Sequence, residues 1–346
     1  ILHIEQDIVL GCHYLTYLRP GSTSKIRRFT DITEALKAHD ADQLKLQDPI
    51  TVTFRDQKVT STLGRFLFNE LFPNDFEFQD DVMTKKKLAQ VMSKVYERYG
   101  QAVSAEIADE LKNLGFDYAT RAGISMGMSD FVDVNKLDEI LSRGEERSAA
   151  ISEQYDQGFI TDDERYRLTI ETWTNSDTEV QKALAEQFQH EDNAMSMAVV
   201  SGARGSIVQV KQVIGSVGIL SDATGRAMEL PIKSNYRDGL NPLEYFTSTR
   251  GQRKGLIDTA LKTADSGYLT RRLVDVAQDV FTIDDNDTDP GFEMLRSDAT
   301  EIGVPFASRL RGRYAAEDLA GYVKRGELIT TDTAEEIDAN VKIDSV

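Results

Sequence analysis

Apolar residues recur at helical spacing along most of the chain, a pattern that predicts a mainly helical protein. One apolar stripe begins after Thr84, a residue type favoured as an N-cap, and ends at Gly100. A second stripe ends at Gly115, which we expect to be a left-handed C-terminal glycine. The two stripes consist of Leu88, Val91, Val95 and Tyr99, and then Val103, Ile107, Leu111 and Leu114. We expect both helices to cover one small core.

The first 73 residues follow a different pattern, in which short β-like runs alternate with turn residues. The runs are Ile8–Leu10, Thr51–Phe54 and Thr60–Thr62, and a turn cluster lies at Pro20–Ser22. We therefore expect short strands and loops before the helices. The fold class predicted for the chain is α+β, predominantly α.

Two further helical segments lie between Leu137 and Phe188, on either side of a polar turn. Gly158 can end the first segment in a left-handed conformation, and Thr161 with Glu164 fits a capping box that opens the second. This arrangement predicts an αα-hairpin. On spacing alone, a packing element is favoured over a binding site.

A long apolar stripe runs from Pro242 to about Val280. One continuous helix of this length would span roughly 50–60 Å at about 1.5 Å per residue. The stripe contains Gly251, Gly255 and Gly267, and each costs about 1 kcal/mol relative to Ala inside a helix. Either the glycines divide the stripe into two shorter helices, or a single helix must bend or allow close approach of another molecule. The spacing leaves both interpretations open.

Length and composition exclude several protein classes. The 346 residues suggest two or three compact units, and 40% hydrophobic with 28% charged residues excludes collagen-like and mostly disordered chains. No apolar run approaches the roughly 18 residues of a membrane span, so we expect a cytoplasmic protein without membrane partners. Cys12 is the sole cysteine, which excludes an intramolecular disulfide and a thiolate-rich metal site built from this chain alone.

Charge is distributed unevenly along the chain. The 40 basic and 58 acidic residues give a net charge of −18, which argues against binding of a polyanion. Between Arg250 and Arg272, however, six basic residues face two acids, and an acidic stretch of eight carboxylates with one arginine follows from Asp275 to Asp298. A short basic stripe thus lies within an acidic protein. Because the chain starts at Ile1 without Met, we expect it to be part of a longer protein.

No stand-alone catalytic set is recognisable in the sequence. The four histidines, which are His3, His13, His39 and His190, lack metal-ligand spacing. The best local candidate for chemistry is Ser201–Ser206, where glycines flank Arg204 and leave room for a polyphosphate that the guanidinium can bind with two hydrogen bonds. As a bare pattern, a plain turn is favoured.

The context of this loop resembles the largest subunit of bacterial DNA-directed RNA polymerases, the beta-prime family. The similar blocks are Ser201–Ser206, Pro231–Asn241, Glu244–Thr249 and Arg253–Asp279. Further similar blocks occur in the family's order at Gln6–Gly11, Tyr14–Thr16, Thr62–Arg65, Tyr118–Gly123 and Gly158–Tyr166. The resemblance covers essentially the whole chain. It implies a fragment of a larger subunit, with a pore region at 1–135, a funnel at 136–230, and a bridge helix (about 242–280) with the start of the next region at 231–346.

The resemblance assigns roles to particular residues. Arg204 matches the arginine that contacts the phosphates of the incoming nucleotide, and Gln209–Leu220 matches the F-loop that supports the bridge helix. The face of the bridge helix that packs against the template base and the incoming pair corresponds to Thr259, Ala260, Thr263 and Ala264. Gly251 and Gly255 match the flexing section. Five basic residues are expected to contact either nucleic-acid phosphates or neighbouring subunits, and the sequence does not decide between the two. They are Arg250, Arg253, Lys254, Lys262 and Arg271.

The resemblance also implies what this chain lacks. The family's aspartate loop, which holds the catalytic magnesium, would precede Ile1, and the trigger loop would follow Val346, so the fragment alone is not expected to be active. Asn286 stands where the family usually has a zinc-ligand cysteine, and amide oxygen is a poor zinc ligand, which makes the zinc site doubtful. Just before the Arg204 loop, the family's methionine pair and Ala-Asp become Met197–Val200, so contacts on the nucleotide side are expected to differ in detail.

The implied activity is nucleotidyl transfer from ribonucleoside triphosphates, templated by DNA, with this segment lining the secondary channel and positioning template and nucleotide. The implied partners are the DNA template, the RNA transcript, the beta, alpha, omega and sigma subunits, and secondary-channel factors at the αα-hairpin. The alternative hypothesis is a non-enzymatic helical module, in which the hairpin and the long helix bind other proteins.

Overall fold

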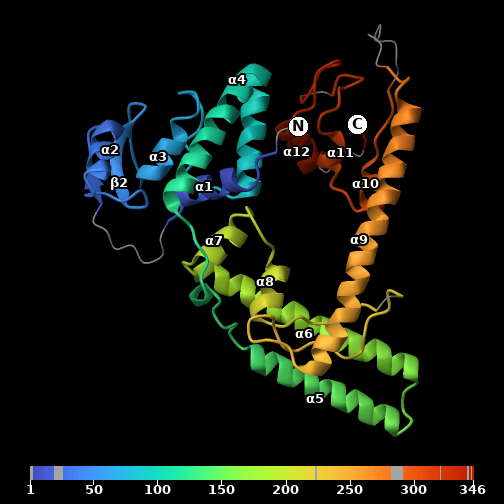
Figure 1. Cartoon of the computed structure of the whole chain (residues 1–346). Helices are drawn as coiled ribbons and strands as arrows, with labels where there is room; N and C mark the ends of the chain where they lie inside the picture. Colours follow the sequence, from blue (N-terminus) through green and yellow to red (C-terminus); the bar gives the residue numbers. More distant parts are fainter. Residues whose placement is uncertain are drawn as a thin grey trace. The chain divides into compact units, whose positions relative to one another are not determined.

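The computed structural model describes residues 3–18, 26–222, 224–281, 291–319, 321–340, 343 and 345–346. The chain divides into two compact units, Ile1–Asp265 and Ser266–Val346, which we describe separately. The division into regions 1–135, 136–230 and 231–346 stays a prediction. The protein is mainly helical and has a small sheet (Figure 1). The predicted turn at Pro20–Ser22 lies outside the described residues.

The elements before residue 131 form the N-terminal part of the first unit. The helices are α1 (Asp7–Thr16), α2 (Ile32–Asp40), α3 (Leu63–Asn69), α4 (Lys85–Ala122) and the 3₁₀ helix η1 (Met128–Asp130). The strands are β1 (Arg27–Arg28), β2 (Pro49–Phe54) and β3 (Gln57–Thr62). Their order in the sheet is β1-β2-β3, with β1 parallel and β3 antiparallel to β2. The strands predicted at Thr51–Phe54 and Thr60–Thr62 therefore pair with each other.

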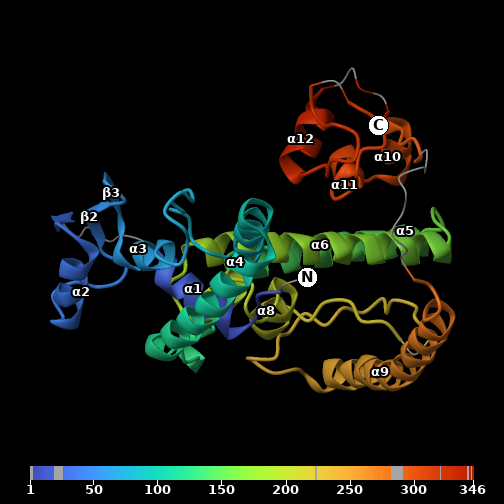
Figure 2. The same ribbon diagram turned by 90° about the horizontal axis from the view of Figure 1, so that it is seen from above.

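One of the predicted β-like runs near the N-terminus is wrong. The run Ile8–Leu10, predicted as β-like, lies inside α1, because Val9, Cys12 and Leu15 recur at helical spacing and are completely buried against α4. This core also takes in the predicted apolar stripes, with Leu88 and Leu111 at most 1% exposed. Figure 2 shows α1 lying next to the two arms of α4.

The sequence predicted that helices end at Gly100 and at Gly115. The structure has one helix, α4, which bends at Gly100 and continues through Gly115. Thr84 caps its N-terminus by accepting a hydrogen bond from the Lys87 amide, and Gly100 has φ 76°, a non-helical conformation that separates the two arms. Gly115, predicted as the C-terminal glycine, is instead inside the helix. The left-handed C-terminal residue is Gly123, with φ 56°.

Gly115 is required for the crossing of α1 and α4 rather than for the end of a helix. A Cβ built on Gly11 would lie 1.8 Å from the Gly115 carbonyl oxygen, and a Cβ on Gly115 would lie 2.8 Å from Cα of Ile8. The two backbones therefore touch at this point, which no larger residue permits.

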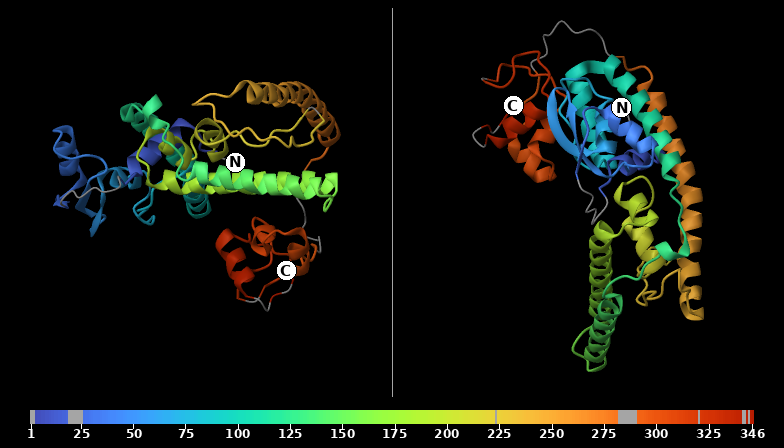
Figure 3. Two further views of the ribbon diagram at one scale, coloured as in Figure 1. Left: turned by 90° about the horizontal axis from the view of Figure 1, so that it is seen from below. Right: turned by 90° about the vertical axis from the view of Figure 1, so that its left-hand side faces the viewer.

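The rest of the first unit contains the hairpin and the elements around it. Its helices are α5 (Leu137–Asp156), α6 (Asp162–His190), α7 (Ala194–Val200), α8 (Ile207–Ile214) and α9 (Pro242–Ala277), the last of which crosses into the second unit. The helices α5 and α6 pack side by side over most of their length (Figures 1 and 3). Gly158 has φ 80°, and Thr161 and Glu164 form the capping box that the sequence predicted. A small core of Val180, Leu184, Phe188, Met195, Val210 and Ile214 joins α6 to α7 and α8.

After the end of α9, the described residues of the second unit form three short helices around a core of their own. They are α10 (Arg296–Ile302), α11 (Phe306–Leu310) and α12 (Thr331–Ala339). Isolated β-bridges, such as Tyr314 with Leu328 and Leu295 with Ser345, complete the unit. Its core includes Met294, Phe306, Leu310, Ile329 and Ile337.

Replacement of Gly11 by Ala is expected to destabilise the N-terminal core by about 3 kcal/mol, because the added methyl group overlaps the backbone of α4. Urea unfolding followed by circular dichroism measures this change. Gly255→Ala is the matched control, since a Cβ there meets no atom within 4 Å and α9 should gain up to about 1 kcal/mol. Equal stabilities of the two variants would contradict the close crossing.

The stability of the same core is expected to fall in mild acid because of His13. This side chain is 2% exposed, its Nδ1 has no hydrogen-bond partner in the described chain, and burial lowers its pKa from 6.5 to about 4. In the unfolded chain, His13 binds a proton below about pH 6.5, whereas in the folded chain it does so only below about pH 4. The free energy of unfolding therefore falls as the pH decreases from about 6.5 to about 4, by about 3 kcal/mol in total. In urea unfolding at several pH values, His13→Phe should lose this part of the pH dependence. An unchanged profile in the variant would show that His13 is not its source.

Candidate nucleotide and nucleic-acid interface

The loop Ser201–Ser206 connects α7 to α8 and is fixed to the N-terminal core. Ser201 is completely buried and its carbonyl accepts a hydrogen bond of 2.8 Å from the amide of Lys85, at the first turn of α4. Ala203 is 8% exposed and belongs to the same core. Gly202 and Gly205 have φ 76° and 77°, left-handed conformations that favour glycine.

Arg204 projects from this fixed loop. Its amide donates to the Ala198 carbonyl at 3.1 Å, which holds the backbone, while its side chain is exposed. In the described part of the chain, the guanidinium has no ion pair or hydrogen bond. Ser206 then starts α8 with a reciprocal capping box to Gln209. The loop therefore presents an uncompensated guanidinium on a rigid support, the geometry that suits bidentate binding of phosphate oxygens.

The long helix α9 is continuous from Pro242 to Ala277, and so ends three residues before the predicted Val280. Its 36 residues correspond to about 54 Å. Of the residues in α9, all of which the structure describes, Ser248 alone is buried. Large apolar side chains are exposed along the helix, including Leu256 at 75% and Val276 at 79%.

The four residues expected to face the template and the nucleotide lie on one side of α9. Thr259, Ala260, Thr263 and Ala264 are all exposed, and their spacing of one and four residues places them together. The hydroxyl of Thr259 donates to the Gly255 carbonyl at 2.8 Å, and that of Thr263 donates to the Thr259 carbonyl at 2.6 Å. Because both hydroxyls bond back into their own helix, the methyl groups of these residues form a small apolar surface.

The two glycines expected to allow flexing have different surroundings. A Cβ on Gly251 would lie 3.3 Å from Cδ1 of Leu220, so Gly251 is where the loop after α8 packs against α9. A Cβ on Gly255 would meet nothing within 4 Å. The hydrogen bond from Thr259 to the Gly255 carbonyl is of the kind that often bends helices.

The predicted basic residues of α9 fall into two groups. Lys262 and Arg271 have acidic neighbours one turn away, with Lys262 Nζ 3.6 Å from Asp258 and Arg271 Nε 4.0 Å from Asp275. Arg250, Arg253 and Lys254 have no ion pair in the described chain. Of these five residues, the three without an ion pair therefore lie in the first half of the helix.

The start of α9 is fixed by one carboxylate. Glu244 accepts hydrogen bonds from the amides of Lys233, Ser234 and Asn241 at 3.0, 3.2 and 3.2 Å, and its own amide donates to the Asn241 side chain. Burial alone would raise the pKa of Glu244, but these hydrogen bonds outweigh it and lower the pKa. Glu244 thus connects the first turn of α9 to the segment that precedes the helix.

Both that preceding segment and α8 are fixed to the hairpin. Lys211 of α8 is 2% exposed and forms an ion pair with Asp177 of α6. Arg165 at the start of α6 bonds Glu229 with two nitrogens, at 2.6 and 3.3 Å. Figure 3 (left) shows the stretch after α8 running between the hairpin and the first half of α9.

Sequence reasoning missed these connections. Asn241 and Glu244 carry a recognisable signal, since Asn followed three residues later by Glu before a helix is a capping pattern. The pairs Lys211–Asp177 and Arg165–Glu229 join residues 34 and 64 positions apart and have no local signal. No hydrogen bond or ion pair in the described chain joins Arg204 to α9.

Metal-binding side chains are not gathered in the described part of the chain, where no three His, Cys, Asp or Glu residues form a group that could hold an ion. Asn286 lies outside the described residues. No helix in the described ranges is both long and apolar enough to cross a membrane.

Three family models match successive stretches of the chain. They are RNA polymerase Rpb1 domain 3 at residues 1–131, domain 4 at residues 160–240 and domain 5 at residues 239–301. The loop with Arg204 falls in the second match and α9 in the third.

Proteins named DNA-directed RNA polymerase subunit beta' are similar to nearly the whole chain. The protein of Desulforamulus reducens is 45% identical over 315 residues, which cover 90% of this chain and 26% of the relative. The protein of Desulforudis audaxviator is 43% identical over 336 residues, which cover 96% of this chain and 29% of the relative. The protein of Caldanaerobacter subterraneus is 40% identical over 365 residues, which cover 96% of this chain and 30% of the relative. The chain thus spans less than a third of the length of these relatives. It belongs to the family of bacterial DNA-directed RNA polymerase beta' subunits.

Proposed function

We propose that this chain is part of a DNA-directed RNA polymerase, in which it lines the secondary channel and positions the template and the incoming ribonucleoside triphosphate for nucleotidyl transfer. The observation that carries the proposal is the exposure of α9. The face formed by Thr259, Ala260, Thr263 and Ala264 consists of small side chains with internally bonded hydroxyls, which suits a surface against which a base pair lies flat.

Arg204 is proposed to bind phosphate oxygens of the nucleotide. Its guanidinium has no partner in the described chain and stands on a loop fixed to the core through Ser201 and Ala203. A preorganised cation of this kind loses little conformational freedom on binding. Positioning and charge neutralisation are the contributions that phosphoryl-type transfer requires from protein side chains.

The magnesium ion of the reaction is proposed to be held by residues of the full enzyme outside this chain, because the described residues form no metal site. The ion would stabilise the charge that develops on the transferred phosphate. The proposed partners are DNA, RNA, the other polymerase subunits, and secondary-channel factors at the hairpin α5–α6. A cytoplasmic location follows from the proposed role in transcription.

The hairpin and the bridge are proposed to act on each other through the segment between α8 and α9. Glu229 of this segment bonds Arg165 of α6, and Leu220 of the segment touches α9 at Gly251. Lys211 of α8, just before the segment, pairs with Asp177 of α6. The alternative of a non-enzymatic interaction module is not favoured, since the relatives similar to this chain carry the polymerase name.

Arg204→Ala in the assembled polymerase is expected to raise the nucleotide concentration that gives half-maximal elongation. The lost charge-assisted hydrogen bonds correspond to about 1.5–3 kcal/mol, or about a tenfold to hundredfold change. Single-nucleotide addition at several nucleotide concentrations measures it. Arg147→Ala, which removes an exposed arginine of α5, is the control and should leave the value unchanged. An identical concentration dependence in the two variants would reject the role of Arg204.

Replacement of both Gly251 and Gly255 by Ala is expected to alter pausing. Ala at 255 stabilises the straight helix by about 1 kcal/mol, and Ala at 251 also places a methyl group 3.3 Å from Cδ1 of Leu220. Pause lifetimes on a defined template measure this effect in the assembled enzyme. Gly267→Ala is the matched control, as it lies in the same helix and a Cβ there meets nothing within 4 Å. If the control changes pausing as much as the double variant, helix stiffness at the proposed flexing section is not the cause.

A further inference from the structure

The hydroxyl of Ser201 makes two hydrogen bonds that both act on the loop presenting Arg204. The side chain of Ser201 is completely buried. Its Oγ donates to the carbonyl of Ala198, in the last turn of α7, at 3.1 Å, and it accepts from the amide of Ala203 at 3.2 Å. The hydroxyl therefore joins the end of α7 to the residue directly before Arg204.

The Ala198 carbonyl holds the next residue of the loop as well. It accepts a hydrogen bond from the amide of Arg204 at 3.1 Å. Ala203 and Arg204 are thus held at one peptide group of α7, the first through the Ser201 hydroxyl and the second directly. In the part of the chain that the structure describes, the amide of Ala203 has no other hydrogen-bond partner. Because Ala203 is 8% exposed, loss of the hydroxyl would leave this amide unpaired and largely shielded from water, which costs free energy.

Hydrogen bonds must select the conformation of this loop, because its glycines do not. Gly202 and Gly205 lie on either side of Arg204 and have φ of 76° and 77°. Glycine reaches many backbone conformations at similar cost. The direction in which Arg204 leaves the loop therefore depends on contacts such as those of the Ser201 hydroxyl.

Replacement of the Ser201 side chain would leave the rest of the anchor in place. The carbonyl of Ser201, which accepts from the Lys85 amide at 2.8 Å, belongs to the backbone. Ser196, in the first turn of α7, offers a matched comparison. It is 2% exposed, and its hydroxyl donates to the carbonyls of Glu191 and Asn193 at 2.8 and 3.0 Å. Both serines are buried and bond backbone carbonyls at an end of the same helix, but the contacts of Ser196 lie at the end away from the loop.

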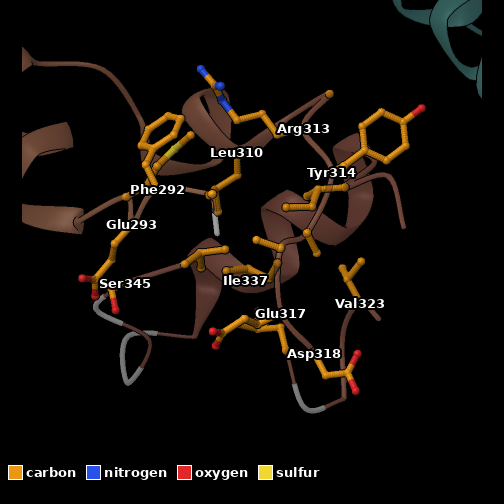
Figure 4. A pocket seen from close by; sticks show the side chains of 18 residues that line it. Phe292, Glu293, Leu310, Arg313, Tyr314, Glu317, Asp318, Val323, Ile337 and Ser345 are labelled. Atoms are coloured by element: carbon orange, nitrogen blue, oxygen red, sulfur yellow. The ribbon is translucent and has the colours of Figure 1, made fainter. Parts of the chain in front are cut away.

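The cavity in the second unit does not offer a competing site for phosphate. Its volume is about 700 Å³, and Arg313 lines it (Figure 4). The guanidinium of Arg313 lies 5.4 Å from the centroid of the Phe292 ring. Three carboxylates line the same cavity, and they belong to Glu293, Glu317 and Asp318. Because these carboxylates would repel a phosphate, the loop with Arg204 is the better site for one.

We propose that Ser201 is a positioning residue for the incoming nucleotide. Its hydroxyl holds the backbone of Ala203 and Arg204 so that the guanidinium meets the phosphate oxygens of a ribonucleoside triphosphate. Since its side chain is completely buried, Ser201 acts through Arg204 and does not touch the nucleotide. The inference rests on the proposed function, from which it takes the role of Arg204.

The test is a double-mutant cycle in the assembled polymerase, measured by single-nucleotide addition at several nucleotide concentrations. The variants are Ser201→Ala, Arg204→Ala and the two together, with Ser196→Ala as the control. Ser201→Ala is expected to raise the nucleotide concentration for half-maximal elongation about three- to tenfold, since it weakens a neutral hydrogen-bond network and leaves the guanidinium present. The rate at saturating nucleotide should stay unchanged, because a binding interaction is weakened.

The cycle separates positioning from a general loss of structure. In the Arg204→Ala background, Ser201→Ala should change the half-maximal concentration less than about twofold, because the group through which it acts is gone. Ser196→Ala should leave both the concentration and the maximal rate unchanged. An unchanged concentration in Ser201→Ala overturns the inference, as does an equal rise in Ser196→Ala or a rise of about twofold or more in the Arg204→Ala background.

The outcome for Arg204→Ala alone distinguishes this inference from the proposed function. If Arg204→Ala raises the half-maximal concentration while Ser201→Ala does not, the inference fails and the proposed function stands. If Arg204→Ala has no effect, both fail.

Ser201→Cys takes the place of Ser201→Ala in the same cycle if the alanine variant does not assemble. Its thiol is a weak donor and a weak acceptor, so both hydrogen bonds are weakened while a side chain is kept. The same results are expected, and the same results overturn the inference. Failure of both variants to assemble would give Ser201 a structural role alone and would also overturn it.

Discussion

The helix α9 must be stable with almost no protein around its side chains. A helix whose apolar residues are exposed on all sides normally gains little from folding, because most helical stability in proteins comes from packing of an apolar face. In α9 the first turns compensate for this. Asn241 and Glu244 cap the N-terminus, Ser248 is buried, and Leu220 packs on Gly251. The remaining turns extend from this anchor and leave Thr259–Ala264 accessible, as the proposed contact with a nucleic-acid end requires.

The anchor of α9 depends in turn on the hairpin. The buried Lys211 holds the end of α8 against α6, and Arg165 holds the loop at Glu229 against the start of the same helix. Removing one partner of a buried ion pair leaves an uncompensated charge, a larger cost than loss of an exposed pair. The Lys211–Asp177 pair is thus the stronger connection.

Periodic patterns and local caps predicted much of this fold. The apolar stripes of α4, the capping box of α6 and the continuous stripe of α9 are all local signals, and the helices lie where those signals occur. The failures involve contacts between distant segments. Gly115 has the residue type of a helix end, yet it is needed because Gly11 of α1 crosses at that point, more than 100 residues away. Arg204 was recognised from its flanking glycines and from the resemblance, whereas the anchoring of its loop on Lys85 has no sequence pattern.

The central claim is that the small-residue face of α9 touches the template at the active centre. It is tested most directly by 4-thiothymidine placed in the template strand opposite the incoming nucleotide, in a stalled elongation complex of the assembled enzyme. Cleavage after Lys254, Lys262 and Arg271 separates the face into the fragments 255–262 and 263–271. The account predicts adducts on one or both of these fragments after irradiation. Adducts found elsewhere in the polymerase, with none on residues 255–271, would contradict it.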